Sequence, residues 1–236
     1  MSPGDSSRCE PKNSEKEAQT APSWTVLEAD REIASFVLEF SYFQEYVVHH
    51  AAAALSAKLI DPSAVGSHNL RVELALAQLN KHLALAVQSV WESHFRRWLR
   101  LCAKELDRPV ALLRRIQIAN TPKLDDLLFE LRGRRMADLA GGQLLHELVL
   151  VGNVVRHGDG PSALRLNALR PDIWLNPPNP ESEGGLDDLA SELAISVDRL
   201  EAYAQSVSDF WLAISSLSGP TEMDPWPFED HSEAQS

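Results

Sequence analysis

The longest stretch with a helical hydrophobic period covers residues 69–106 and reads NLRVELALAQLNKHLALAVQSVWESHFRRWLRLCAKEL. Apolar side chains recur every three to four residues along it, which places them on one face of a helix. They are Val72, Leu76, Leu79, Leu83, Val87, Val90 and Trp98. Pro109 follows and ends the pattern. The sequence therefore predicts one long helix that needs partners along its apolar face.

Helical patterns flank this stretch on both sides. Thr25 and Glu28 have the spacing of a capping box and open a predicted helix that runs to about Ala57. This helix and the one over 69–106 are expected to pack as an antiparallel pair. Further helices are predicted at residues 110–118, 142–156 and 196–217, and after Thr121-Pro122, where Thr caps the helix and Pro takes its first position.

The fold class follows from these patterns and from composition. The chain has 236 residues, of which 44% are hydrophobic and 24% charged, and its formal net charge is -12. No segment alternates like a strand, so we expect an all-α, multi-helix bundle built on long antiparallel helices. Its boundaries are predicted as a disordered leader (1–23), one helical domain (24–219) and a disordered acidic tail (220–236).

Several protein classes are excluded or disfavoured. The longest stretch without an acidic or basic residue is 12 residues, as in Tyr46–Ala57, which is too short to span a membrane. The polar N-terminus lacks the apolar core of a signal peptide, so the expected location is the cytoplasm. The two cysteines form no metal or redox motif, and phosphate-loop and dinucleotide-binding motifs are missing. We therefore expect no metal and no cofactor.

Positive charge gathers in the middle of this acidic chain. Residues 96–135 contain eleven basic and five acidic side chains, a net charge of +6. Arginine binds phosphate well, so these residues are candidate RNA contacts. The candidates are Arg96, Arg97, Arg100, Arg132, Arg134 and Arg135. The alternative is that they form solvated helix faces, paired with Glu92, Glu105, Asp125 and Glu130.

The most distinctive motif is residues 148–162, LVLVGNVVRHGDGPS. An apolar helix ends there in a polar cluster, and Gly158 suits the turn just beyond the helix. Asn153 and His157 are four residues apart, so they share one helix face, with Arg156 beside them. These three polar side chains are expected to converge.

The motif resembles the HEPN superfamily, all-α bundles that include RNA-cleaving toxins and defence proteins. Catalytic members place Arg, then a polar residue that is often Asn, then three further residues and then a His near a helix end, and they usually act as dimers. Asn153, His157 and the following Gly158 match that pattern, whereas Gly152 takes the place of the Arg. The resemblance covers about residues 70–217 and is most specific over 147–160.

The resemblance implies an RNA- or nucleotide-binding protein, and metal-independent cleavage of RNA as a candidate activity. In that reaction His157 would act as the base, Asn153 would orient it or bind the phosphate, and Arg156 would supply the cation that Gly152 cannot. It also implies a homodimer and a protein partner, such as an antitoxin or defence component. The alternative is a catalytically inactive helical interaction module, in which the motif only ends a helix.

Overall fold

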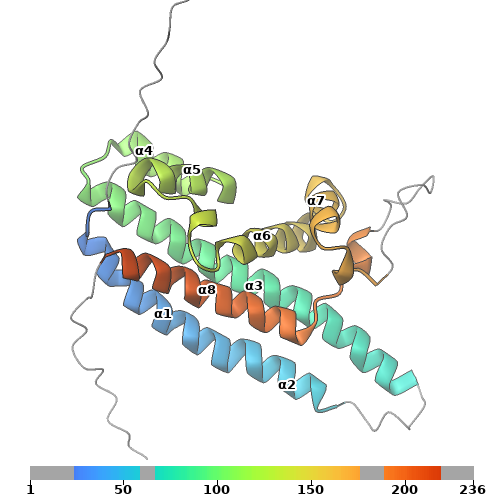
Figure 1. Cartoon of the computed structure of the whole chain (residues 1–236). Coiled ribbons are helices and arrows are strands. Elements are labelled where there is room, and N and C mark those ends of the chain that lie inside the picture. Colours follow the sequence, from blue (N-terminus) through green and yellow to red (C-terminus); the bar gives the residue numbers. More distant parts are fainter. Residues whose placement is uncertain (1–23, 59–66, 176–188, 219–236) are drawn as a thin grey trace, which may run out of the picture.

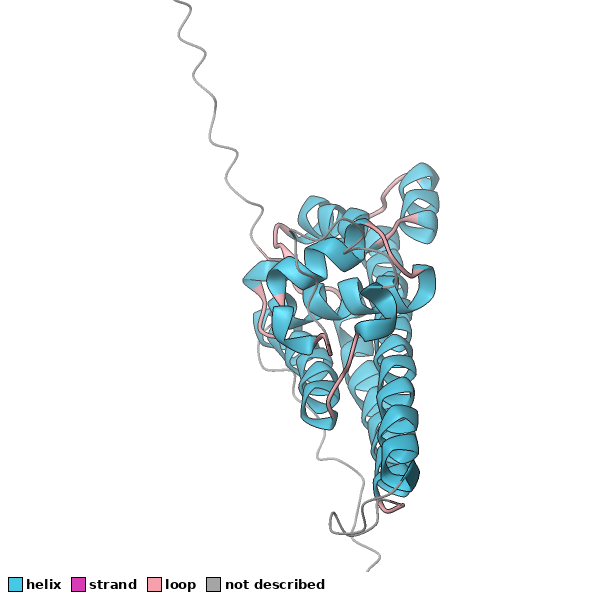
Figure 2. Cartoon of the chain, turned by 90° about the vertical axis from the view of Figure 1, so that its right-hand side faces the viewer, coloured by secondary structure: helices cyan, strands magenta, loops and turns pink. Residues whose placement is uncertain are grey.

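The computed structural model describes residues 24–58, 67–175 and 189–218, and over these ranges the chain forms helices and no β-strand (Figure 2). The predicted all-α fold is confirmed. The helices are α1 (Glu32–Phe43), α2 (His50–Ser56), α3 (Ser67–Glu105), α4 (Val110–Ile118), α5 (Thr121–Arg132), α6 (Gly142–His157), α7 (Pro161–Leu169) and α8 (Val197–Leu217). The predicted disordered leader and the tail from residue 220 lie outside the described residues.

Helix α3 is the axis of the bundle. It has 39 residues, which corresponds to a length of about 58 Å. Helix α1, the π-helical turn η2 (Gln44–His49) and α2 form one rod that runs antiparallel to α3, and α8 lies beside both (Figure 1). The shorter helices α4, α5 and α6 pack on α3, and α7 packs on α6. The predicted antiparallel pairing is therefore confirmed.

Two predicted helix starts are wrong. The first helical turn is a 3-10 turn, η1 (Glu28–Arg31), in which the Asp30 carboxylate accepts the N–H of Leu27 at 3.1 Å, so Thr25 is not the cap. At α5 the cap is Asn120, which accepts the N–H of Lys123. The Thr121 hydroxyl instead donates to the Glu92 carboxylate at 2.9 Å, because a charged acceptor on α3 lies within reach.

The core is centred on aromatic side chains of α3 and α8. Trp91, Phe95 and Trp98 follow one another along α3 and are fully buried. Phe210 meets the Phe95 ring edge-on at 5.4 Å, and Trp211 meets Trp98 in the same way at 6.1 Å. Such edge-to-face contacts add to the free energy gained by burying these large rings.

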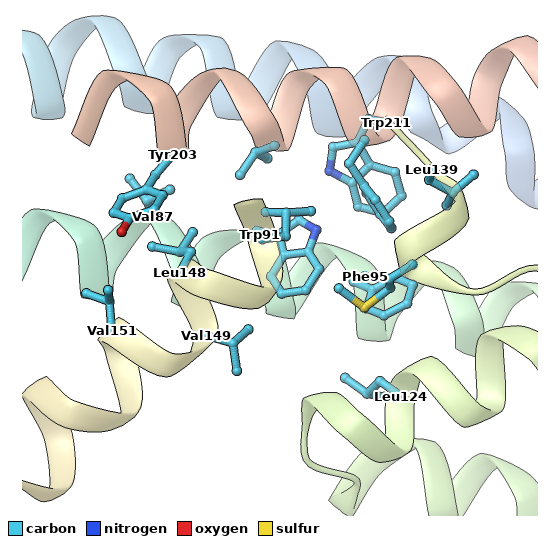
Figure 3. Packing of buried hydrophobic residues seen from close by; sticks show 14 of the residues in the cluster. Val87, Trp91, Phe95, Leu124, Leu139, Leu148, Val149, Val151, Tyr203 and Trp211 are labelled. Atoms are coloured by element: carbon cyan, nitrogen blue, oxygen red, sulfur yellow. The ribbon is translucent and has the colours of Figure 1, made fainter. Parts of the chain in front are cut away.

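Helix α6 lies across α3 and α8. Figure 3 shows Leu148 and Val151 of α6 among Val87 and Trp91 of α3 and Tyr203 of α8. Residues 147–152 of α6 are buried in this contact, whereas Gln143 and His146 near its start and Arg156 and His157 in its last turn are exposed. The fold therefore exposes the polar end of the sequence motif and buries its apolar part.

Two kinds of feature are not found in residues 24–58, 67–175 and 189–218, which the structure describes. No helix in these ranges combines the length and apolar character needed to cross a bilayer. The same ranges contain no group of three or more His, Cys, Asp or Glu side chains placed to bind a metal ion.

Candidate functional site

The C-terminal turn of α6 carries Asn153, Arg156 and His157. Asn153 is half-buried, whereas Arg156 and His157 are exposed. The helix ends at Gly158, which has a φ of 72° and donates its N–H to the carbonyl of Val154 at 2.8 Å. The three predicted site residues therefore lie together on one exposed turn.

Arg156 is fixed in place by α3. Its Nη2 donates to the amide oxygen of Gln88 at 2.7 Å and lies 3.5 Å from the hydroxyl of Ser89. Both partners are neutral, so neither of them offsets the positive charge of the guanidinium. Within the described chain, no side-chain hydrogen bond involves Asn153 or His157, which leaves the amide and the imidazole available to a ligand.

Gly152 is buried against the same glutamine. A Cβ atom built at position 152 would overlap the amide oxygen of Gln88 and lie 2.9 Å from its Cδ. An arginine there requires Gln88 to move. The Gln88 side chain thus fills the space that the side chain of the arginine expected at position 152 would enter. Gln88 also binds Arg156, which lies one helical turn after Gly152 on α6.

Gln88 belongs to a polar row along α3 that reaches α4 and α5. Its Nε2 donates to Glu92 at 3.2 Å, and Glu92 also accepts Arg96 at 2.6 Å and the Thr121 hydroxyl. The negative charge of Glu92 is therefore balanced by Arg96, which is four residues further along α3. Arg156 lies at the other end of this row, and no acidic side chain of the described residues pairs with it.

The arginines predicted to bind RNA do not form one surface. Arg96 donates to the carbonyls of Ile116, Gln117 and Ala119, and so caps the C-terminus of α4.

Two more of these arginines form ion pairs. Arg97 pairs with Glu32 at 2.9 Å, and Arg135 pairs with Asp125 and Asp126. Only Arg100 and Arg134 of the six are exposed without an ion pair in the described ranges.

Arg132 departs most from the expectation, because its side chain is only 2% exposed. It pairs with Asp30 at 2.8 Å, and its guanidinium lies 3.9 Å from the ring centroid of Trp24 and 5.6 Å from that of Trp98. A group enclosed in this way cannot meet RNA at the surface, so Arg132 is corrected to a core residue.

The alternative reading of the basic segment matches most of its contacts. Glu92, Asp125 and Glu130 each pair with an arginine of residues 96–135. Glu105 differs, because its carboxylate accepts the N–H groups of Glu28 at 2.7 Å and Ala29 at 3.0 Å. It therefore holds η1 against the end of α3.

A buried polar cluster around Glu147 was not predicted as a site. Its carboxylate accepts a hydrogen bond from the Tyr203 hydroxyl at 2.6 Å. The Nη1 of Arg170 lies 3.2 Å from each of the two carboxylate oxygens, and Arg199 donates to both of them as well. Burial raises the pKa of Glu147, while the Tyr203 and Arg170 contacts oppose that shift. The partners lie 23 to 56 residues away in the sequence, so no local pattern could have identified them.

This cluster joins α6, η4 (Pro171–Ile173) and α8. Arg170 also forms a two-point pair with Asp172, at 2.7 and 2.6 Å. A shallow cavity of about 280 Å³ lies beside it, lined by both arginines and by Asp172 and Asp198. Since both arginines are already paired with carboxylates, we interpret the cluster as a contact that holds α6, η4 and α8 together rather than as an anion-binding site.

Comparisons with protein-family models, curated proteins and solved structures find no match to this chain. The assignment of a function therefore rests on the residues themselves and on the resemblance of the motif.

Proposed function

We propose that the exposed end of α6 binds RNA by its phosphates and that the chain does not cleave it. The observation that carries this proposal is the state of Arg156. Arg96, Arg97, Arg132 and Arg135 all bind carboxylates, whereas Arg156 is held by the neutral amide of Gln88. Its charge is positioned yet available to an anion.

Asn153 and His157 complete a site suited to a phosphodiester. An amide and an imidazole beside a guanidinium offer several donors to phosphate and 2′-hydroxyl oxygens. The glycines after the helix add open space, since a Cβ at Gly158 or Gly160 would meet nothing within 4 Å. The sugar-phosphate backbone of an RNA can therefore approach the end of α6 closely.

Binding without cleavage follows from position 152. Cleavage needs a cation that stabilises charge developing on the phosphoryl oxygens while a base deprotonates the 2′-hydroxyl. The motif position for that cation is Gly152, and the space beside it contains Gln88. Arg156 is displaced by one turn and tied to α3, which favours a binding role over a catalytic one.

A second candidate function is an interaction module that partners a defence or toxin–antitoxin protein. It is favoured by Tyr42 and Tyr46, which are 47% and 64% exposed and stack at 6.0 Å on the outer face of the α1–η2 rod. Exposed tyrosines of this kind are enriched in protein interfaces. The homodimer and the protein partner remain predictions.

The test is to incubate the purified chain with labelled single-stranded and hairpin RNA in EDTA and to measure binding and cleavage together. We expect binding without new RNA ends, and weaker binding by His157→Ala. The control is His146→Ala, an exposed histidine on the same helix. Cleavage that is lost in His157→Ala would replace our proposal with a ribonuclease. Absence of binding would favour the interaction module.

A further inference from the structure

The outward face of α4 combines exposed apolar groups with positive charge. Val110, Arg114 and Ile118 are four residues apart and therefore form one stripe along the helix. Val110 is 65% exposed and Ile118 is 85% exposed. The opposite face buries Leu112 and Ile116 in the core. The stripe is thus a helix face that the described part of the bundle leaves uncovered.

The charge of this face contrasts with that of the whole protein. Helix α4 contains two arginines and no acidic residue, while the chain carries a net charge of -12. Arg115 pairs with Glu130 of α5, but Arg114 is exposed and has no ion pair in the described ranges. Arg108, just before the helix, is exposed as well. An acidic and apolar segment would complement this surface.

The chain itself contains such a segment after α8. Residues 219–236 include Met223, Trp226 and Phe228, together with five acidic residues and no Lys or Arg. The spacing places large apolar groups between carboxylates, which is the complement of an apolar stripe that carries arginine. No other stretch of comparable length in the sequence combines two aromatic residues with five acids and no base.

The end of α8 is fixed near the start of α4. The Ser218 hydroxyl donates at 2.8 Å to the Asp30 oxygen that also binds Arg132, the last residue of α5. The same 3-10 turn, η1, is bound by Glu105 at the end of α3, five residues before α4 begins. Figure 1 shows the end of α8 and the helices α4 and α5 at the same end of the bundle.

We propose that residues 219–236 dock on the α4 face of their own chain. The carboxylates pair with Arg108 and Arg114, and the apolar side chains cover Val110 and Ile118. Fully extended, 18 residues span about 60 Å, so the length of the segment does not limit its reach. A tether this short gives an effective concentration on the order of millimolar, which makes even a weak contact populated.

The experiment uses the full chain with one nitroxide label in the segment. Ser232→Cys carries the label in a Cys9→Ser background, since Cys102 is fully buried and burial raises its pKa, which keeps it unreactive. Paramagnetic broadening is measured on backbone amides by NMR. We expect broadening of residues 110–118 at low salt. We expect its loss at 0.5 M salt, because added salt shortens the Debye length and screens the pairing of exposed charges.

Two matched variants separate docking on α4 from general charge effects. Arg114→Glu should restore the α4 signals, whereas Arg165→Glu, an exposed arginine on α7, should leave them broadened. Neutralising the segment (Glu222→Gln, Asp224→Asn, Glu229→Gln, Asp230→Asn) should act like Arg114→Glu without touching the bundle. Unbroadened α4 amides in the parent chain, or broadening that Arg114→Glu leaves unchanged, would overturn the proposal.

A mixed sample tests whether the contact is within one chain. Isotope-labelled chains without nitroxide are combined with unlabelled chains that carry it. We expect no broadening of α4 in this mixture. Broadening there would show that the segment binds a second copy, which contradicts docking on its own chain.

Discussion

His94 is a half-buried residue of α3 whose ring packs against α1. Its ring stacks on Phe36 at 4.8 Å, and its Nε2 is 3.0 Å from the carboxylate of Glu39. Burial lowers the pKa of His94, Glu39 opposes that shift, and nearby Arg97 adds to it. The fold therefore favours the neutral imidazole.

The sign of the pH dependence follows from this preference. As pH falls below about 6.5, the unfolded chain takes up the proton more readily than the fold, so the free energy of unfolding decreases. His94→Gln should remove part of this decrease between pH 7.5 and pH 5, as measured by urea unfolding. His146→Gln, an exposed histidine, should retain it. Equal pH profiles for His94→Gln and the parent chain would contradict the assignment.

Gly152 and Gln88 form a coupled pair. Gly152→Ala displaces the Gln88 amide and breaks its bonds to Arg156 and Glu92, which should cost about 1 to 2 kcal/mol. With Gln88→Ala the space is open, and Gly152→Ala should then stabilise the chain by about 0.5 to 1 kcal/mol through helix propensity. Urea unfolding of the four chains measures the coupling. An equal cost in both backgrounds would exclude the proposed overlap.

At the scale of elements, the first residue of α6 is restricted by its neighbour η3 (Met136–Asp138). A Cβ at Gly142 would overlap the carbonyl oxygen of Met136, and a backbone group cannot rotate away as a glutamine side chain can. Gly142→Ala should therefore destabilise the fold by about 1 to 3 kcal/mol.

The matched control lies in the same turn. Gln143 is exposed, so Gln143→Ala should change stability by no more than about 0.5 kcal/mol. Thermal unfolding of both variants gives the comparison. Similar midpoints for the two would show that α6 can shift away from η3.

The elements show which features the sequence can predict. Helices α3, α4 and α8 were located from their period, because a helix face is set by residues three to four apart. The convergence of Asn153, Arg156 and His157 is local in the same sense. The role of Gly152 is not, since it depends on Gln88, which is 64 residues earlier.

The ion-pair partners of the arginines also could not be predicted from the sequence. Arg132 and Asp30 are 102 residues apart, and both were polar residues with no pattern that indicated burial. The π-helical turn η2 also has no signature in the hydrophobic period. Tertiary contacts decide these features, so a composition of eleven basic residues in one segment overstated the exposed positive charge.

At the scale of the whole molecule, the Asp30–Arg132 pair joins η1, α5 and the end of α8. Removing only the arginine leaves Asp30 buried without its counter-charge. Arg132→Met should therefore destabilise the fold by about 3 to 5 kcal/mol. Arg115→Met removes a pair with Glu130 that is largely exposed, and should cost about 1 kcal/mol or less. Urea unfolding measures both free energies. An equal loss of stability in the two variants would contradict the stabilising role of the buried Asp30–Arg132 pair.

The central claim concerns Arg156 as an available cation at the end of α6. It is tested most directly by the salt dependence of RNA binding, measured by fluorescence anisotropy for the parent chain, Arg156→Ala and Arg165→Ala. We predict that only Arg156→Ala lowers the affinity several-fold and reduces the slope of log K against log salt by about 0.7, the value for one contact to single-stranded RNA. A slope and an affinity unchanged in Arg156→Ala would contradict the account.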